Sequence, residues 1–258
     1  MHDAEEVLTM HFTAELRHDD ALLERTFVLG EIPGILWTPA TAGPSAPVPL
    51  LLLGHPGRLD AMHPRLLARA RQAAELGFAS ATIELPHAGE RPPSAALDQA
   101  RAELRSAIRA GETPSDDVVD RLVLPLVEEA VPEWRALVDA VLALPEVGGP
   151  VGYSGGVIAI GTRLAAVEPR VVAAVLFAGS YVPRAALADA AAVSIPVHVL
   201  LQWDDAGNDR RAALELFDVF GSAEKTLAAN TGGHTGVPEF AGEEAARFFA
   251  RHLRSATS

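Results

Sequence analysis

The stretch Gly152-Tyr153-Ser154-Gly155-Gly156 decides the fold of this chain of 258 residues. It matches the pattern G-x-S-x-G, in which a serine stands at a sharp turn from a strand into a helix. It lacks the spacing G-x-G-x-x-G, and no phosphate-binding lysine follows it, which argues against a nucleotide-binding loop. We therefore expect a strained backbone at Ser154, small neighbours two positions away, and a hydroxyl exposed above the N-terminus of a helix.

Strands and helices alternate on both sides of this motif. The alternation is typical of an α/β protein with a doubly wound, mainly parallel sheet, here in a single domain that spans residues 1–258. Runs of β-forming or apolar residues predict strands at 24–29, 32–37, 50–53, 78–84, 150–153, 171–178, 197–202 and 225–229. Helical spacing predicts helices at 63–76, 98–109, 116–129, 132–144, 154–167, 214–220 and 239–253.

The interval between residues 84 and 150 is too long for a plain crossover between two strands. Its last helix, at 132–144, can serve as the crossover, which leaves residues 92–131 as a helical insertion. The insertion departs from the carboxyl end of a strand, the edge of the sheet at which such folds bind ligands. We expect it to form a cap over the site, and two extra packing helices on a flank are the alternative.

A serine hydroxyl needs a base within hydrogen-bond reach to act as a nucleophile. Three histidines follow Ser154 in the chain. His198 lies inside an apolar strand, and His252 lies among arginines in the last helix. His234 follows two glycines in a loop after the final strand, from which an imidazole can reach back to the serine. We predict that His234 is the base.

The acid that orients this base should follow the penultimate strand, since the chain order that goes with this motif is Ser, acid, His. Three aspartates compete in the loop that begins at Trp203. Asp205 has the better distance from the strand end, Asp204 is the runner-up, and Asp209 is expected to cap a helix or to be a surface charge. The predicted catalytic residues are therefore Ser154, Asp205 and His234.

An oxyanion hole requires two backbone N–H groups. Gly155, the residue after the nucleophile, should supply one of them. The other should come from the loop that follows the strand 50–53. Pro56 has no N–H, so Gly57 is the expected donor and Arg58 the alternative. His55 is expected to order this loop.

These motifs together resemble the α/β-hydrolase superfamily over nearly the whole chain from about Phe27 onward. The segment Glu84-Leu85-Pro86-His87-Ala88-Gly89-Glu90-Arg91 is similar to the D-x-P-G-H-G-x-R stretch of its dienelactone-hydrolase-like and peptidase-like bacterial members. Dienelactone hydrolase itself uses a cysteine nucleophile, and this chain has no cysteine. The resemblance therefore implies an α/β-hydrolase fold and serine-type chemistry on a carboxylic ester, lactone or thioester, without a cofactor.

The expected substrate is a small molecule, bound by side chains near the strand ends. We predict that Tyr153, Arg58, Trp203 and His87 line its site together with the insertion. The same three catalytic residues could instead serve C–C bond hydrolysis, cyclisation or acyl transfer on a bacterial metabolite. A non-catalytic binding protein that kept the scaffold is a third hypothesis.

The composition excludes several other classes of function. The chain has 21 Lys and Arg against 34 Asp and Glu, a net charge of −13, which disfavours nucleic acids and anionic membrane surfaces as partners. The absence of cysteine excludes disulfides, zinc–thiolate sites and thiol catalysis, and we predict no metal site. The N-terminus is acidic, unlike a signal peptide, and no apolar run is long enough to span a membrane. We expect a soluble, cytoplasmic protein and leave a homodimer open.

Overall fold

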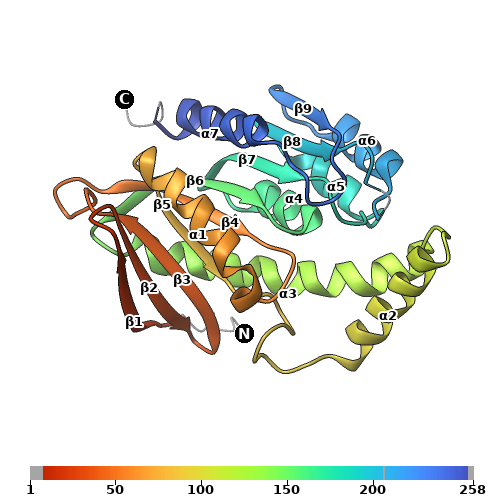
Figure 1. Ribbon diagram of the computed structural model, residues 1–258, viewed down its shortest axis with the longest axis horizontal. Coiled ribbons are helices and arrows are strands. Elements are labelled where there is room, and N and C mark those ends of the chain that lie inside the picture. Colours follow the sequence, from red (N-terminus) through yellow and green to blue (C-terminus); the bar gives the residue numbers. More distant parts are fainter. Residues whose placement is uncertain (1–7, 206, 255–258) are drawn as a thin grey trace, which may run out of the picture.

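The computed structural model describes residues 8–205 and 207–254 of the chain. Its core is a sheet with the strand order β1-β2-β3-β5-β4-β6-β7-β8-β9 (Figure 1). The strands from β5 to β9 pair in parallel, and β1, β2 and β3 pair antiparallel at one edge. The strands are β1 (Met10–His18), β2 (Leu22–Leu29), β3 (Ile32–Pro39), β4 (Val48–Gly54), β5 (Ala79–Ile83), β6 (Val147–Gly155), β7 (Val171–Phe177), β8 (Val197–Gln202) and β9 (Lys225–Asn230).

Helices cover both faces of this sheet. The alternation of side chains along β4 shows the division: Leu50 and Leu52 belong to one apolar cluster, and Leu51 and Leu53 to the other. The first cluster includes side chains of α3, α4, α5 and α6, and the second includes side chains of α1 and α7. The helices are α1 (Leu59–Glu75), α2 (Ala95–Arg109), α3 (Asp116–Leu142), α4 (Ile158–Val167), α5 (Ala186–Ala192), α6 (Arg210–Val219) and α7 (Glu239–Arg254).

The predicted doubly wound, mainly parallel sheet is confirmed, and two local predictions are wrong. The two helices expected at 116–129 and 132–144 form one continuous helix, α3, with Pro125 and Pro132 inside it. Ten buried side chains between Val119 and Val141 hold α3 against the core, and this packing outweighs the backbone hydrogen bonds that the prolines cannot donate. The strand β1 was not predicted, because its side chains are exposed almost throughout and give no apolar pattern.

Residues 92–131 form α2 and the first half of α3. The two helices pack against each other as a hairpin, and Figure 1 shows α2 lying beyond the end of the sheet, away from β1, β2 and β3. Ser94 and Ser115 cap α2 and α3, each accepting a hydrogen bond from a backbone N–H of the first turn, as is common at helix N-termini.

Candidate active site

Ser154 lies at the carboxyl end of β6, and the turn toward α4 follows it rather than falling on it. The ladder between β4 and β6 runs on to the pair Gly54 and Gly155, and α4 begins at Ile158. Positive φ angles occur at Gly155 (+79°) and Gly156 (+73°), and Ser154 is not among the residues with positive φ. The predicted strained serine and the predicted helix start at residue 154 are therefore wrong, because the two glycines absorb the turn at little steric cost.

The small neighbours two positions from Ser154 are glycines, as expected, and they permit close contacts around β6. A Cβ on Gly156 would lie 2.7 Å from the Tyr153 hydroxyl and 2.9 Å from Gly54 Cα. A Cβ on Gly152 would lie 3.0 to 3.1 Å from side chains of β4 and α7. No side chain fits at position 156 without moving backbone.

His234 and Asp205 form a hydrogen-bonded pair. The imidazole Nδ1 of His234 donates to Asp205 Oδ2 at 2.7 Å, and the aspartate side chain is buried. The ring of Phe177, at the end of β7, packs edge-on against the imidazole with 5.9 Å between ring centroids. This contact and the hydrogen bond fix the ring plane and leave Nε2 available for another partner.

Asp204, the runner-up for the acid, contacts the backbone of the histidine loop instead. Its carboxylate accepts hydrogen bonds from Gly232 N and Gly233 N at 2.9 Å. These two bonds lower the pKa of Asp204. Gln202 also holds the loop, since its side-chain amide donates to Gly233 O at 2.8 Å. The two aspartates thus have different roles: Asp205 orients the imidazole, and Asp204 orders the loop that carries His234.

Ser154 and His234 line one cavity of about 260 Å³ between α1 and α7, which we call the α1–α7 cavity. No hydrogen bond joins Ser154 to His234 within residues 8–205 and 207–254, as is common for catalytic groups without substrate. The floor is the sheet face that carries Leu53 and Val175. The walls are apolar side chains of the two helices and of the loops, namely Met62, Ala73, Leu76, Val237, Ala245, Ala246 and Phe249.

Arg69 of α1 binds the ends of β4 and β6 together. Its guanidinium donates to Gly54 O at 2.9 Å and to Ser154 O at 2.6 Å. Burial lowers the pKa of Arg69 to about 10. This residue was not among the predicted site residues. A clue in the sequence is that Arg65 and Arg69 are spaced by one helical turn in the first helix after the predicted oxyanion loop.

The loop between β4 and α1 holds the other predicted oxyanion donor. The ring of His55 bridges this loop to β5, with Nδ1 2.7 Å from Gly57 O and Nε2 2.9 Å from Ile83 O. This buried ring takes the ordering position that we predicted for it. Pro56 lines the α1–α7 cavity, and Gly57 lies next to it in the chain.

Two of the four predicted substrate-binding residues point elsewhere. Tyr153 is only 1% exposed and packs edge-on against Trp134 of α3, so its predicted contact with substrate is wrong. The ring of His87 makes hydrogen bonds with Pro92 O and with Glu129 of α3, and it does not line the α1–α7 cavity. Successive side chains of a strand point to opposite faces of the sheet. Tyr153 therefore faces the core, on the other face from Ser154, its neighbour in β6.

The other two are exposed and do not line the cavity that holds Ser154. The side chain of Arg58 is 63% exposed, pairs with Asp60 and lines neither cavity. Trp203 is 45% exposed, and the Arg210 guanidinium lies over its ring at 4.3 Å. Trp203 lines a second cavity, separate from the one that holds Ser154.

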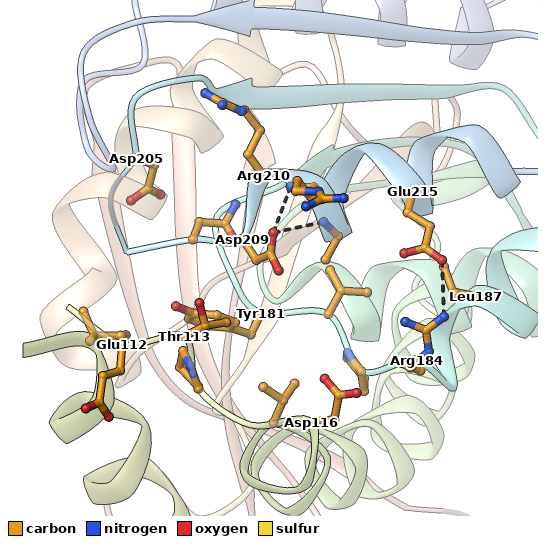
Figure 2. Close-up of a pocket in the computed structure, with 18 of the residues that line it drawn as sticks. Glu112, Thr113, Asp116, Tyr181, Arg184, Leu187, Asp205, Asp209, Arg210 and Glu215 are labelled. Atoms are coloured by element: carbon orange, nitrogen blue, oxygen red, sulfur yellow. Dashed lines mark hydrogen bonds and ion pairs between the residues drawn. The ribbon is translucent and has the colours of Figure 1, made fainter. Parts of the chain in front are cut away.

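This second cavity, of about 870 Å³, lies beneath the turn between α2 and α3, and we call it the α2–α3 cavity. Figure 2 shows side chains from three segments around it: Glu112 and Thr113 from the α2–α3 turn, Tyr181 from the loop after β7, and Asp205 and Asp209 from the loop after β8. Asp209 caps α6, as predicted, by accepting hydrogen bonds from Arg211 N and Ala212 N. Since Asp205 lines this cavity and His234 lines the other, the pair stands between them.

Glu84, which occupies the first position of the segment 84–91, has a structural role. Its buried carboxylate accepts hydrogen bonds from Leu59 N and Leu85 N, which joins the start of α1 to the end of β5. Burial raises the pKa of Glu84. Gly89 has a φ of +60° and passes close to this carboxylate, where a Cβ would lie 2.3 Å from Glu84 Oε2.

Within residues 8–205 and 207–254, no group of three or more His, Cys, Asp or Glu side chains could hold a metal ion. Within the same residues, no helix combines the length and the apolar character needed to cross a membrane.

The fold is shared with known hydrolases. No protein-family model and no curated protein matches the sequence. Among solved structures, a PEG-bound cold-adapted esterase from an Arctic intertidal metagenomic library is 26% identical, with a TM-score of 0.72 over 94% of this chain and 99% of that one. The acetyl xylan esterase from Paenibacillus sp. R4 is 14% identical, with a TM-score of 0.68 over 95% and 89%. Dienelactone hydrolase from Anabaena variabilis is 15% identical, with a TM-score of 0.58 over 95% and 100%. The chain thus has the α/β-hydrolase fold, which it shares with carboxylic ester hydrolases.

Proposed function

We propose that this protein is a serine hydrolase that cleaves a carboxylic ester through an acyl-enzyme. The observation that carries the proposal is the hydrogen bond of 2.7 Å from His234 Nδ1 to Asp205, made by an imidazole that lines the same cavity as Ser154. The similarity to solved esterases supports ester bonds as the target.

In the proposed first step, His234 Nε2 takes the proton of Ser154 Oγ as this oxygen attacks the ester carbonyl carbon. Asp205 stabilises the imidazolium that forms. The tetrahedral intermediate collapses, the C–O bond to the alcohol breaks, and the alcohol leaves with the proton held by His234. Water then attacks the acyl-enzyme while His234 takes a proton from it. The acid leaves, and His234 returns the proton to Ser154 Oγ.

The oxyanion would be stabilised by the backbone N–H groups of Gly155 and Gly57, since Gly155 is the last residue of β6 and Gly57 follows the neighbouring strand β4 at the same edge of the sheet. Arg69 contributes indirectly, since it holds the carbonyl groups of Gly54 and Ser154 and so fixes both strand ends. No metal or cofactor is required in this scheme.

We further propose that the α2–α3 hairpin is a cap that encloses the leaving group. The α2–α3 cavity lies under the turn of this hairpin and reaches the Asp205 loop, so it adjoins the catalytic pair on the side away from the α1–α7 cavity. Its lining carries charged and hydroxyl side chains, which suits a polar alcohol.

Fluorophosphonate labelling, with intact mass and peptide mapping, tests the serine assignment. We expect one adduct on Ser154 in the native protein, none in Ser154→Ala, and much slower labelling in His234→Ala. Ser180→Ala is the matched control, because Ser180 lines the same cavity and accepts a long hydrogen bond of 3.4 Å from Ile158 N. Native protein that is folded but unlabelled would contradict the proposal, as would an adduct on Ser180.

A further inference from the structure

The α1–α7 cavity has an unusual balance of charge for this chain. The protein carries a net charge of −13, yet the residues among 8–205 and 207–254 that line this cavity include two arginines, Arg65 and Arg69, and no aspartate or glutamate. The α2–α3 cavity shows the opposite balance, with Glu112, Asp116, Asp204, Asp205, Asp209 and Glu215 against Arg184, Arg210 and Arg211. The cavity that contains Ser154 is therefore positive within an acidic protein.

Arg69 makes no ion pair with an acidic side chain of residues 8–205 or 207–254. Within the part of the chain that the structure describes, its hydrogen bonds go to two neutral carbonyl oxygens, Gly54 O and Ser154 O. A guanidinium has five N–H donors, so three remain for other acceptors. Although burial lowers the pKa of Arg69 to about 10, the group stays protonated at neutral pH. A desolvated cation without a counter-ion is costly and favours an anion beside it.

Arg65 adds a second positive charge to the same wall. It lies four residues before Arg69 on α1, so both side chains stand on one face of the helix and line the same cavity. Their repulsion contributes to the lowered pKa of Arg69. Among the described residues Arg65 makes no ion pair, whereas Arg71 of the same helix lies 4.0 Å from Asp19.

From this charge pattern, and resting on the proposed function, we infer that the acyl part of the substrate carries a carboxylate that binds between Arg65 and Arg69. Arg69 contacts the carbonyl oxygen of Ser154 itself, so the carboxylate lies only a few bonds from the carbonyl that Ser154 attacks. The other cavity walls, such as Met62 and Phe177, are apolar and suit a short methylene spacer. The substrate class is thus a monoester of a short dicarboxylic acid, and hydrolysis releases the dicarboxylate.

The test compares two stable esters of equal chain length, monomethyl glutarate and methyl pentanoate, which differ by a carboxylate in place of a methyl group. Acid release is followed in a pH-stat with the native protein, Arg65→Glu, and the matched control Arg71→Glu, which changes the charge of α1 equally outside the cavity. We expect the native protein to prefer glutarate in kcat/KM by about tenfold or more, as for a charged hydrogen bond. Arg65→Glu should remove this preference, and Arg71→Glu should keep it.

A second readout needs no turnover. Free glutarate should slow the fluorophosphonate labelling of Ser154 in the native protein and in Arg71→Glu, but not in Arg65→Glu. A native protein that is labelled at Ser154 yet prefers pentanoate, or an Arg65→Glu variant that keeps the preference, would overturn the carboxylate site alone. Absence of labelling would overturn the proposed function as well, so the two failures are distinguishable.

Discussion

His234 and Asp205 are 29 residues apart in the chain, and a hydrogen bond of 2.7 Å joins them. Two different strands bring them together, because Asp205 follows β8 and His234 follows its neighbour β9. The loop of His234 is held in turn by Asp204 and Gln202, both at the end of β8. The residues at the end of β8 therefore both orient the imidazole and hold the loop after β9 that carries it.

Replacing the two neighbouring aspartates should separate their roles. Asp205→Asn should lower kcat by about 10³- to 10⁴-fold, since an amide no longer holds the imidazole in the required tautomer. Asp204→Asn should lower kcat by about tenfold at most, because its backbone partners Gly232 and Gly233 can still bond to an amide oxygen. Ester hydrolysis at saturating substrate provides the measurement. Equal losses in the two variants would refute the division of roles.

The turn after Ser154 should tolerate no side chain at its second glycine. Gly156→Ala should destabilise the protein by about 1–3 kcal/mol more than Gly77→Ala, because a Cβ at 156 meets the Gly54 backbone at 2.9 Å whereas nothing lies within 4 Å of one at 77. Both glycines have positive φ, so the backbone penalty is common to the two variants. Chemical denaturation measures the difference, and equal stabilities would contradict the close approach of β4 and β6.

The ion pair at the end of α4 should make stability depend on pH in the acid range. Hydrogen bonds from Arg170 lower the pKa of the buried Glu168 below its ordinary value of 4.5, despite desolvation. A carboxyl with a lowered pKa stabilises the fold fully above the pKa of the unfolded chain and loses this effect as the pH falls through the folded pKa. Glu168→Gln should therefore cost about 1–3 kcal/mol at pH 7, and its deficit should shrink below about pH 4.5.

Urea unfolding of the native protein and Glu168→Gln across this pH range provides the test. Asp139→Asn is a useful control, because Asp139 also pairs with Arg170 but its side chain is largely exposed. A Glu168→Gln deficit that stays constant from pH 7 to the acid range would refute the linkage.

Because Tyr153 lies in the core, we expect its replacement by phenylalanine to leave substrate binding unchanged. Tyr153→Phe should leave KM within about twofold of the native value, because the ring faces Trp134 rather than the cavity. Steady-state kinetics on a short-chain ester measures this. An increase of tenfold in KM would show that Tyr153 contacts the substrate after all.

The sequence predicted the sheet and its order of elements well, because buried strands such as 197–202 are continuous apolar runs bounded by turns. It also predicted which side chains meet: Asp205 and His234 each follow a strand, and parallel strands end at one edge.

What the sequence did not predict depends on tertiary packing. The sequence predicts a break before Pro132, with a new helix starting there, yet its neighbours Val131 and Trp134 are buried and keep α3 continuous. The unusual backbone conformation predicted for Ser154 occurs instead at Gly155 and Gly156, because glycine adopts a positive φ at little steric cost. The role of Arg69 could not be predicted, because the spacing of Arg65 and Arg69 shows only a shared helix face and not the backbone carbonyls that Arg69 binds.

The continuity of α3 has a consequence for how substrate arrives. At 27 residues the helix is about 40 Å long, and its buried side chains begin at Val119, in its first turn. The α2–α3 hairpin is therefore held to the core by one continuous helix, and α3 has no break between the hairpin turn and the core. We therefore expect the α2–α3 cavity to stay open without ligand, so that the ester enters by diffusion and no movement of a lid limits the rate.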